Sequence, residues 1–206
     1  MKQSASIFAI LLLFAIAARA ESPMQEVKAT TERVLVLLKA PEVQGESKKD
    51  ERRQLVRAET DKRFAWDQTA RACLGRYWTK RTPAEKAEFV KVFSEYLKDN
   101  YSDKIATSYT DLDKVDYKGE KIIDHYASVK LVLTTKAGVD HSLEYRMEKA
   151  PTGDEWKIYD VVIEGVSLVN NYRDQFDAVI AQSSYEALLK EIETKGIKQT
   201  ATPKNL

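Results

Sequence analysis

The stretch WKIYDVVIEGVSLVNNYRDQF, residues 156–176, changes its hydrophobic period halfway along. Its first half alternates like a β-strand but is apolar on both faces, with Trp156, Ile158 and Val162 on one face and Tyr159, Val161 and Ile163 on the other. After Gly165 the apolar residues return at helical spacing. We therefore expect a buried strand that leads directly into an amphipathic helix. Gly165 would occupy the corner between them because it has no Cβ.

Two blocks of the chain carry motifs that occur together in one family. The first is YDVVIEGVSLVNNYR at residues 159–173. The second consists of Phe64-Ala65-Trp66, Ala70-Arg71, Leu74-Gly75-Arg76-Tyr77-Trp78, Thr82-Pro83, Phe89, Phe93, Leu97 and Tyr101. Over about residues 25–195 the chain resembles the MlaC-type periplasmic phospholipid carriers, also called the toluene-tolerance or ABC-transporter auxiliary family. It departs from them at Ala65, because the family usually has Phe-Asp-Phe at these three positions.

The first twenty residues, MKQSASIFAILLLFAIAARA, have the pattern of a secretory signal peptide. Lys2 precedes an apolar stretch over residues 7–17, and the small residues Ala18 and Ala20 follow. We expect cleavage after Ala20 and a periplasmic protein, since the apolar stretch is short for a transmembrane helix. An uncleaved membrane anchor is the alternative. A lipoprotein is not expected, because no cysteine follows the cleavage site.

The balance of charge gives no field that would attract nucleic acid or an anionic membrane. Removal of residues 1–20 takes Lys2 and Arg19 from the 33 basic residues and none from the 32 acidic ones, which leaves a net charge of −1. The chain is 43% hydrophobic and 9% aromatic, a globular composition. We expect one domain over residues 21–206, with a frayed tail from about residue 197.

Hydrophobic periodicity and capping signals predict the remaining elements. Helices are expected over residues 24–39, 49–59 and 83–100, followed by a last helix capped by Ser183 that ends at Gly196. The start at Pro83 is the clearest, because Thr82 and Glu85 form a capping box. Strands are expected as a hairpin over residues 110–123 around Lys118-Gly119, then over residues 126–135, 143–148 and 156–163. These elements predict an α+β protein with a mostly antiparallel, curved sheet of about four or five strands packed against several helices. The family resemblance implies the NTF2-like version of that class.

Residues with catalytic or metal-binding chemistry are few. His125 and His141 are the only histidines, and Cys73 is the only cysteine. No metal, no cofactor other than bound lipid as cargo, and a buried structural thiol are therefore expected. Asp160 and Glu164 share a strand face and could act as an acid and base pair. A role at the end of a strand and the start of a helix is the simpler interpretation, so we do not expect an enzyme.

An apolar sheet face opposite aromatic-rich helices can form either a solid core or a cleft. The resemblance favours a cleft that binds a phospholipid by its acyl chains. The expected lipid-binding residues are Phe89, Phe93, Leu97, Val129, Leu131, Leu133, Leu143, Tyr145, Met147, Tyr159, Val161, Ile163, Val166, Val169 and Phe176.

The resemblance also implies partners for such a carrier. These are an inner-membrane ABC transporter complex with its substrate-binding MCE-type component and an outer-membrane lipoprotein complex, with the carrier itself a monomer and no nucleic acid bound. A carrier of another lipid, such as a hopanoid, is the alternative within this function. A periplasmic enzyme on an NTF2-like scaffold is the alternative outside it.

Overall fold

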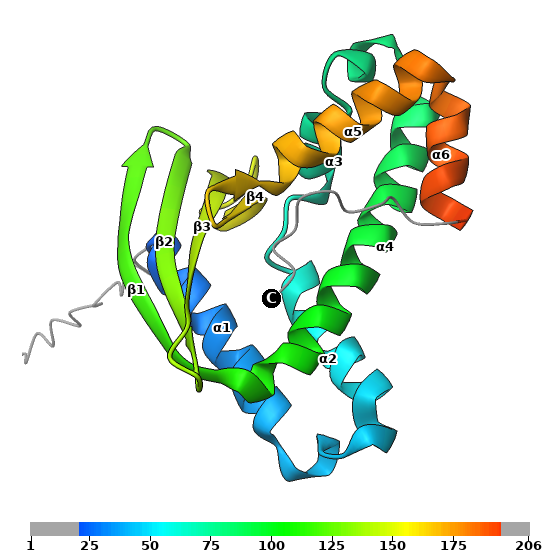
Figure 1. Ribbon diagram of the computed structural model, residues 1–206. Coiled ribbons are helices and arrows are strands. Elements are labelled where there is room, and N and C mark those ends of the chain that lie inside the picture. The colour runs from blue at the N-terminus through cyan, green and yellow to red at the C-terminus, as the bar shows by residue number, and fades with distance from the viewer. Residues whose placement is uncertain (1–20, 195–206) are drawn as a thin grey trace, which may run out of the picture.

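The computed structural model describes residues 21–194, which form helices on one side of a curved antiparallel sheet (Figure 1). The helices are α1 (Pro23–Lys39), α2 (Lys49–Asp61), α3 (Trp66–Leu74), α4 (Pro83–Ser108), α5 (Leu168–Gln182) and α6 (Tyr185–Thr194). The strands are β1 (Leu112–Ile123), β2 (Tyr126–Thr135), β3 (Asp140–Lys149), β4 (Trp156–Ile163) and β5 (Val166–Ser167), which are neighbours in this order. The predicted α+β class with an antiparallel sheet is confirmed.

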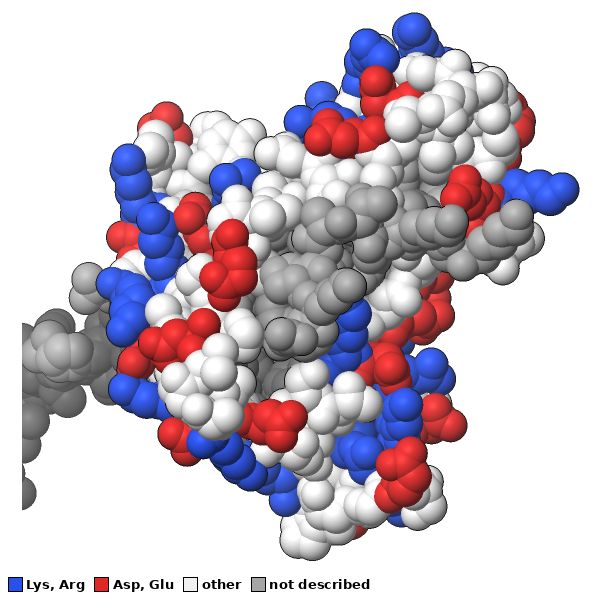
Figure 2. Space-filling model, viewed as in Figure 1, with Lys and Arg blue, Asp and Glu red and all other residues white. Residues whose placement is uncertain are grey.

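The sheet and α4 lie on opposite sides of the molecule (Figure 1). At the lower end α1 packs against β1 and β2, and α2 packs between α1 and α4. At the upper end α5 packs against β4, α3 and α6. Basic and acidic residues alternate over the sheet and over α2 on the face drawn in Figure 2. No helix among residues 21–194 is both long and apolar enough to cross a membrane.

Two large groups of buried side chains stabilise these layers. The helical core, between α3, α4, α5 and α6, is built on Phe89, Phe93, Tyr172, Phe176 and Leu188. The sheet core lies between the sheet and α1 and includes Val27, Val129, Met147, Trp156 and Ile158. Strand β4 belongs to the sheet core and leads through β5 into α5 of the helical core, so it connects the two.

A β-bulge in β4 changes which side chains share a face. Asp160 lies opposite Arg146, but Ile158 lies opposite the next residue along β3, so Tyr159 is an extra residue. Ile158 therefore lies on the same face as Val161, and the strict alternation expected from the sequence is wrong at this position. The backbone of Ile158 also pairs in parallel with the segment before α3, through a 2.8 Å bond from the Ala65 amide.

The connection from β4 to α5 is a tight hairpin rather than a direct corner. Glu164 and Gly165 have φ angles of 49° and 79° and turn the chain back into β5. Gly165 is thus needed for its positive φ, and the helix begins three residues after it, at Leu168. Ser167 caps α5 by accepting a 3.0 Å hydrogen bond from the Asn170 amide.

Three further expectations differ from the structure. Residues 112–123 form one strand, so the hairpin predicted around Lys118-Gly119 is wrong: Gly119 lies at a bulge, and the turn is at Asp124. Helix α4 continues beyond residue 100 to Ser108. Helix α6 is capped by Ser184, whose hydroxyl accepts from the Ala187 amide at 3.1 Å. The predicted signal peptide, the helix end at Gly196 and the frayed tail lie outside the described residues.

Candidate functional site

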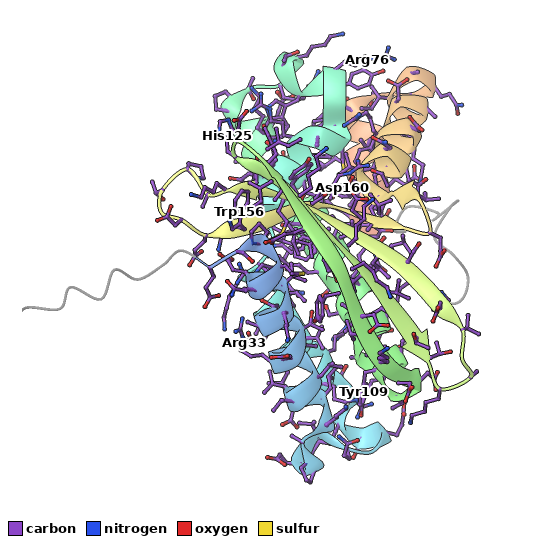
Figure 3. All side chains as sticks on the ribbon, turned by 90° about the vertical axis from the view of Figure 1, so that its left-hand side faces the viewer. Arg33, Arg76, Tyr109, His125, Trp156 and Asp160 are labelled. Atoms are coloured by element: carbon purple, nitrogen blue, oxygen red, sulfur yellow. The ribbon has the colours of Figure 1, made fainter. Side chains whose placement is uncertain are left out.

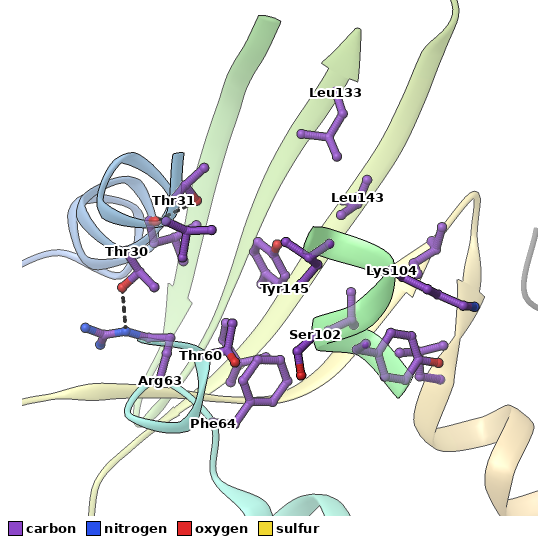
Figure 4. A pocket seen from close by; sticks show the side chains of 18 of the residues that line it. Thr30, Thr31, Thr60, Arg63, Phe64, Ser102, Lys104, Leu133, Leu143 and Tyr145 are labelled. Carbon is purple, nitrogen blue, oxygen red and sulfur yellow. Dashed lines mark hydrogen bonds between the residues drawn. The ribbon is translucent and has the colours of Figure 1, made fainter. Parts of the chain in front are cut away.

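A cavity of about 650 Å³ lies between the inner face of the sheet, α1 and the C-terminal half of α4 (Figure 4). Tyr109 and Asp160 line its opposite ends, and Figure 3 shows them near the lower and upper ends of the sheet. The cavity therefore extends along much of the sheet. Its volume falls within the usual range for small-molecule sites in proteins.

Nine of the fifteen predicted lipid-binding residues line the cavity. These are Leu97, Leu131, Leu133, Leu143, Tyr145, Tyr159, Val161, Ile163 and Val169. They come from α4, β2, β3, β4 and α5, and most of them are apolar. The bulge adds Ile158 to the same wall. Contact of any of them with a lipid stays a prediction.

The other six predicted residues are not part of the cavity wall. Phe89, Phe93 and Phe176 are fully buried among one another, because the N-terminal half of α4 faces α5 and α6 instead of the sheet. Val129 and Met147 are fully buried in the sheet core with Val27 and Trp156. Val166 is 36% exposed on the short strand β5.

The threonines that helices contribute to the cavity wall can donate their hydroxyl protons to backbone carbonyls. Thr30 and Thr31 donate to the carbonyls of Glu26 and Val27 at 3.0 and 2.9 Å. Thr60 donates in the same way to the carbonyl of Val56 at 2.9 Å, and the Thr69 hydroxyl lies 3.1 Å from the carbonyl of Ala65 and 3.0 Å from that of Tyr159. A hydroxyl that is satisfied by its own helix needs no hydrogen-bond partner in the cavity. The wall is therefore apolar in effect despite these residue types.

Charged residues of the wall are held by groups of the protein. Arg63 forms an ion pair with Glu26 and donates to the carbonyl of Trp156 at 2.8 Å, which ties α1 to the start of β4. Lys98 lies 2.6 Å from a carboxylate oxygen of Asp61. Burial lowers the pKa of Lys104, whose ammonium lies 5.4 Å from the ring centre of Tyr101.

Reasoning from sequence missed the contributions of α1 and of the last turns of α4. The α4 side of the cavity includes Tyr101, Ile105 and Ser108, which continue the stripe that begins at Phe93 and Leu97 with spacings of three and four. That spacing could have predicted the longer helix. From α1, Val34 and Leu38 line the cavity, whereas the expected lipid-binding residues include none from this helix.

Cys73 lies in the cavity wall and is 1% exposed, which confirms the predicted burial. Burial, with a smaller contribution from the charge of Asp160, raises the pKa of its thiol well above the usual value. A thiol with a raised pKa reacts slowly, because the thiolate is the nucleophile.

The two acidic residues considered as a catalytic pair hold the backbone in place. Asp160 accepts hydrogen bonds from the Ser167 hydroxyl at 2.7 Å, the Val169 amide at 3.0 Å and Arg146 at 3.1 Å. Glu164 accepts from the Ser142 amide at 2.9 Å. These carboxylates join β4 to α5 and to β3. Within residues 21–194, no three His, Cys, Asp or Glu residues are grouped so as to hold a metal ion.

Comparison with known proteins gives consistent results. The MlaC protein family matches residues 28–194. The intermembrane phospholipid transport system binding protein MlaC of Haemophilus influenzae is 23% identical over 123 residues, which span 58% of this chain and 56% of that protein. The match thus covers only about half of that relative. A phospholipid-binding protein from Ralstonia solanacearum, solved in complex with a phospholipid, superposes with a TM-score of 0.73 at 26% identity and covers 85% of this chain and 97% of that one.

Proposed function

Because this chain belongs to the MlaC family, we propose that it is a periplasmic carrier that holds a phospholipid by its acyl chains. The cavity of about 650 Å³, with its largely apolar wall, is the observation that carries this proposal. Two relatives support it, since one is named as part of an intermembrane phospholipid transport system and the other was solved with a phospholipid.

The physical requirement on such a carrier is to keep acyl chains out of water. Each exposed methylene costs about 0.8 kcal/mol, so a two-chain lipid with roughly thirty of them faces a cost on the order of 20 kcal/mol if it is transferred bare. A dry apolar cavity removes most of that cost, and it does so without a catalytic residue. The lipid then has nearly the same free energy in the carrier as in a membrane, because both environments are apolar.

The proposed route lies between the outer membrane and an inner-membrane ABC transporter. In this proposal the carrier is a monomer that receives or delivers lipid at an outer-membrane lipoprotein complex and at the MCE-type component of the transporter. The predicted signal peptide supports a periplasmic location for the carrier, between these two complexes. Mass spectrometry of the freshly purified protein identifies the cargo and distinguishes a phospholipid from a hopanoid.

The substitution Val161→Trp tests whether the cavity holds the lipid. Val161 lines the cavity opposite Tyr145, so an indole there occupies space that the acyl chains would fill. We expect the delipidated variant to lose less than about 1 kcal/mol of unfolding free energy, because the indole enters existing space. Its lipid binding should be abolished, and added lipid should no longer raise its Tm as it raises that of the wild type.

Val162→Trp is the matched control for this experiment. Val162 is 7% exposed and does not line the cavity, so the same indole must displace packed neighbours at a cost of about 1 to 3 kcal/mol. The folded fraction of this variant should still bind lipid. A large loss of stability in Val161→Trp together with undiminished lipid binding would remove the cavity from the proposal.

A further inference from the structure

Tyr145 differs from the helical threonines described above in the cavity wall. It lies in the middle of β3, and Figure 4 shows its ring inside the cavity, between α1 and α4. Among residues 21–194 its hydroxyl has no hydrogen-bond partner, whereas the threonines around it donate to their own helices. It is therefore a polar group that points into an apolar space and is not satisfied by the described part of the chain.

The ring of Tyr145 is surrounded by protein. Burial raises the pKa of Tyr145 to about 12, although part of its surface remains accessible. The two observations agree because Tyr145 lines the cavity, so the protein surrounds its ring while the cavity leaves part of the side chain accessible. A hydroxyl removed from water without a partner costs free energy, so buried tyrosines almost always find one.

Tyr185, in the helical core, shows the usual solution. Burial also raises the pKa of Tyr185 to about 12, yet its hydroxyl donates to the backbone carbonyl of Glu85 at 3.1 Å. The two tyrosines thus share a desolvated environment and differ in whether the described protein supplies an acceptor. For Tyr145, the acceptor has to come from what fills the cavity.

We propose that the Tyr145 hydroxyl donates a hydrogen bond to an ester carbonyl oxygen of the bound lipid, an inference that rests on the carrier function proposed above. Acyl chains carry no acceptor, and a charged headgroup is costly to bury in an apolar cavity. The ester carbonyl is the neutral acceptor at the head of each chain. Tyr145 therefore fixes how deeply the lipid sits and favours ester-linked over ether-linked lipids.

The test compares a diacyl phosphatidylcholine with the dialkyl-ether phosphatidylcholine of equal chain length, in competition for the delipidated protein. The wild type should prefer the ester lipid about fivefold, the ratio that one neutral hydrogen bond of about 1 kcal/mol gives. Tyr145→Phe should bind both lipids equally, with its affinity for the ether lipid unchanged. The infrared carbonyl band of the bound diester should also shift to higher frequency in Tyr145→Phe, because the hydrogen bond is lost.

Tyr185→Phe is the control, since it removes the hydroxyl of a buried tyrosine that lies outside the cavity. It should keep the fivefold preference and lose stability instead. Equal binding of the two lipids by the wild type would overturn the inference while leaving the carrier function intact, as would a preference that survives in Tyr145→Phe. Binding of neither lipid by the wild type would overturn both.

Discussion

The two halves of α4 border two very different regions of the molecule. Its N-terminal half places Phe89 and Phe93 in the helical core, where ring centres lie 5.1 to 5.8 Å apart and both side chains are fully buried. Its C-terminal half places Tyr101 and Ile105 against the cavity, and Ile105 is 39% exposed. One helix therefore borders both a filled and an unfilled space.

The difference shows what a hydrophobic stripe does and does not specify. From residue 89 to residue 108 the stripe keeps its spacing of three and four, and Leu97 belongs to both regions. Whether the stripe meets a solid core depends on what lies opposite it. Aromatic side chains of α5 fill the space opposite the N-terminal half of α4. Opposite the C-terminal half, the cavity separates α4 from the sheet.

The substitution with the largest expected effect on stability is Phe93→Ala in the helical core. Phe93 lies 5.2 Å from the ring of Tyr172 and 5.1 Å from that of Phe176, so its removal leaves a void that rigid rings cannot fill. We expect a loss of about 3 to 5 kcal/mol of unfolding free energy, measured by urea denaturation of delipidated protein.

Lipid bound per folded molecule should stay unchanged in Phe93→Ala, because Phe93 does not line the cavity. This result would show that the N-terminal half of α4 supports stability and does not contact the lipid. A cost below about 1 kcal/mol combined with loss of lipid would show that the N-terminal half also faces the cargo, and the distinction between core and cavity would fail.

The sequence predicted the parts of the fold that depend on local chemistry. The capping box at the start of α4 forms as expected, with the Thr82 amide donating to Glu85 at 2.7 Å and the Glu85 amide to Thr82 at 3.3 Å. The strands β2 and β3 follow their alternation without a break in their shared register. These features are encoded within a few residues of one another, so one sequence suffices to find them.

Features that depend on distant pairing were not predicted. The bulge at Tyr159 exists because β4 pairs with β3 on one edge and with the segment around Phe64 on the other. Gly119 was taken for a hairpin turn, yet it lies at a bulge of a strand whose partner is β2. Which of the apolar residues line the cavity could not be predicted either, since a core and a cleft have the same pattern of hydrophobic residues.

Asp160→Asn tests the connection between the two regions. The carboxylate of Asp160 holds the Val169 amide and the Ser167 hydroxyl at the start of α5, and it is 3% exposed. Loss of its charge should cost about 1.5 to 3 kcal/mol of unfolding free energy, the value of a hydrogen bond to a charged group. The measurement is again urea denaturation.

Arg146→Gln is the matched control for that substitution. Its side chain is 39% exposed, so loss of its ion pair with Asp160 should cost less than about 1 kcal/mol. Equal costs for the two substitutions would mean that the ion pair, and not the capping of α5, joins β4 to the helical core. A hydrolytic activity that disappears in Asp160→Asn would instead support an enzyme.

The smallest effect on stability is expected for Leu133→Ala in the cavity wall. Leu133 is only half-buried and faces the open space, so the atoms that are removed enlarge a cavity that already exists. The usual penalty for a new void is therefore absent, and we expect a loss of about 1 kcal/mol or less of unfolding free energy in delipidated protein.

Leu188→Ala is the matched control, because Leu188 is fully buried in the helical core, and it should cost about 2 to 5 kcal/mol. With lipid bound, Leu133→Ala should show a smaller rise in Tm than the wild type, since contacts with the chains are lost. Equal costs for the two leucines in delipidated protein would mean that the sheet closes onto α4 when the cargo leaves, and the cavity would then exist only in the loaded state.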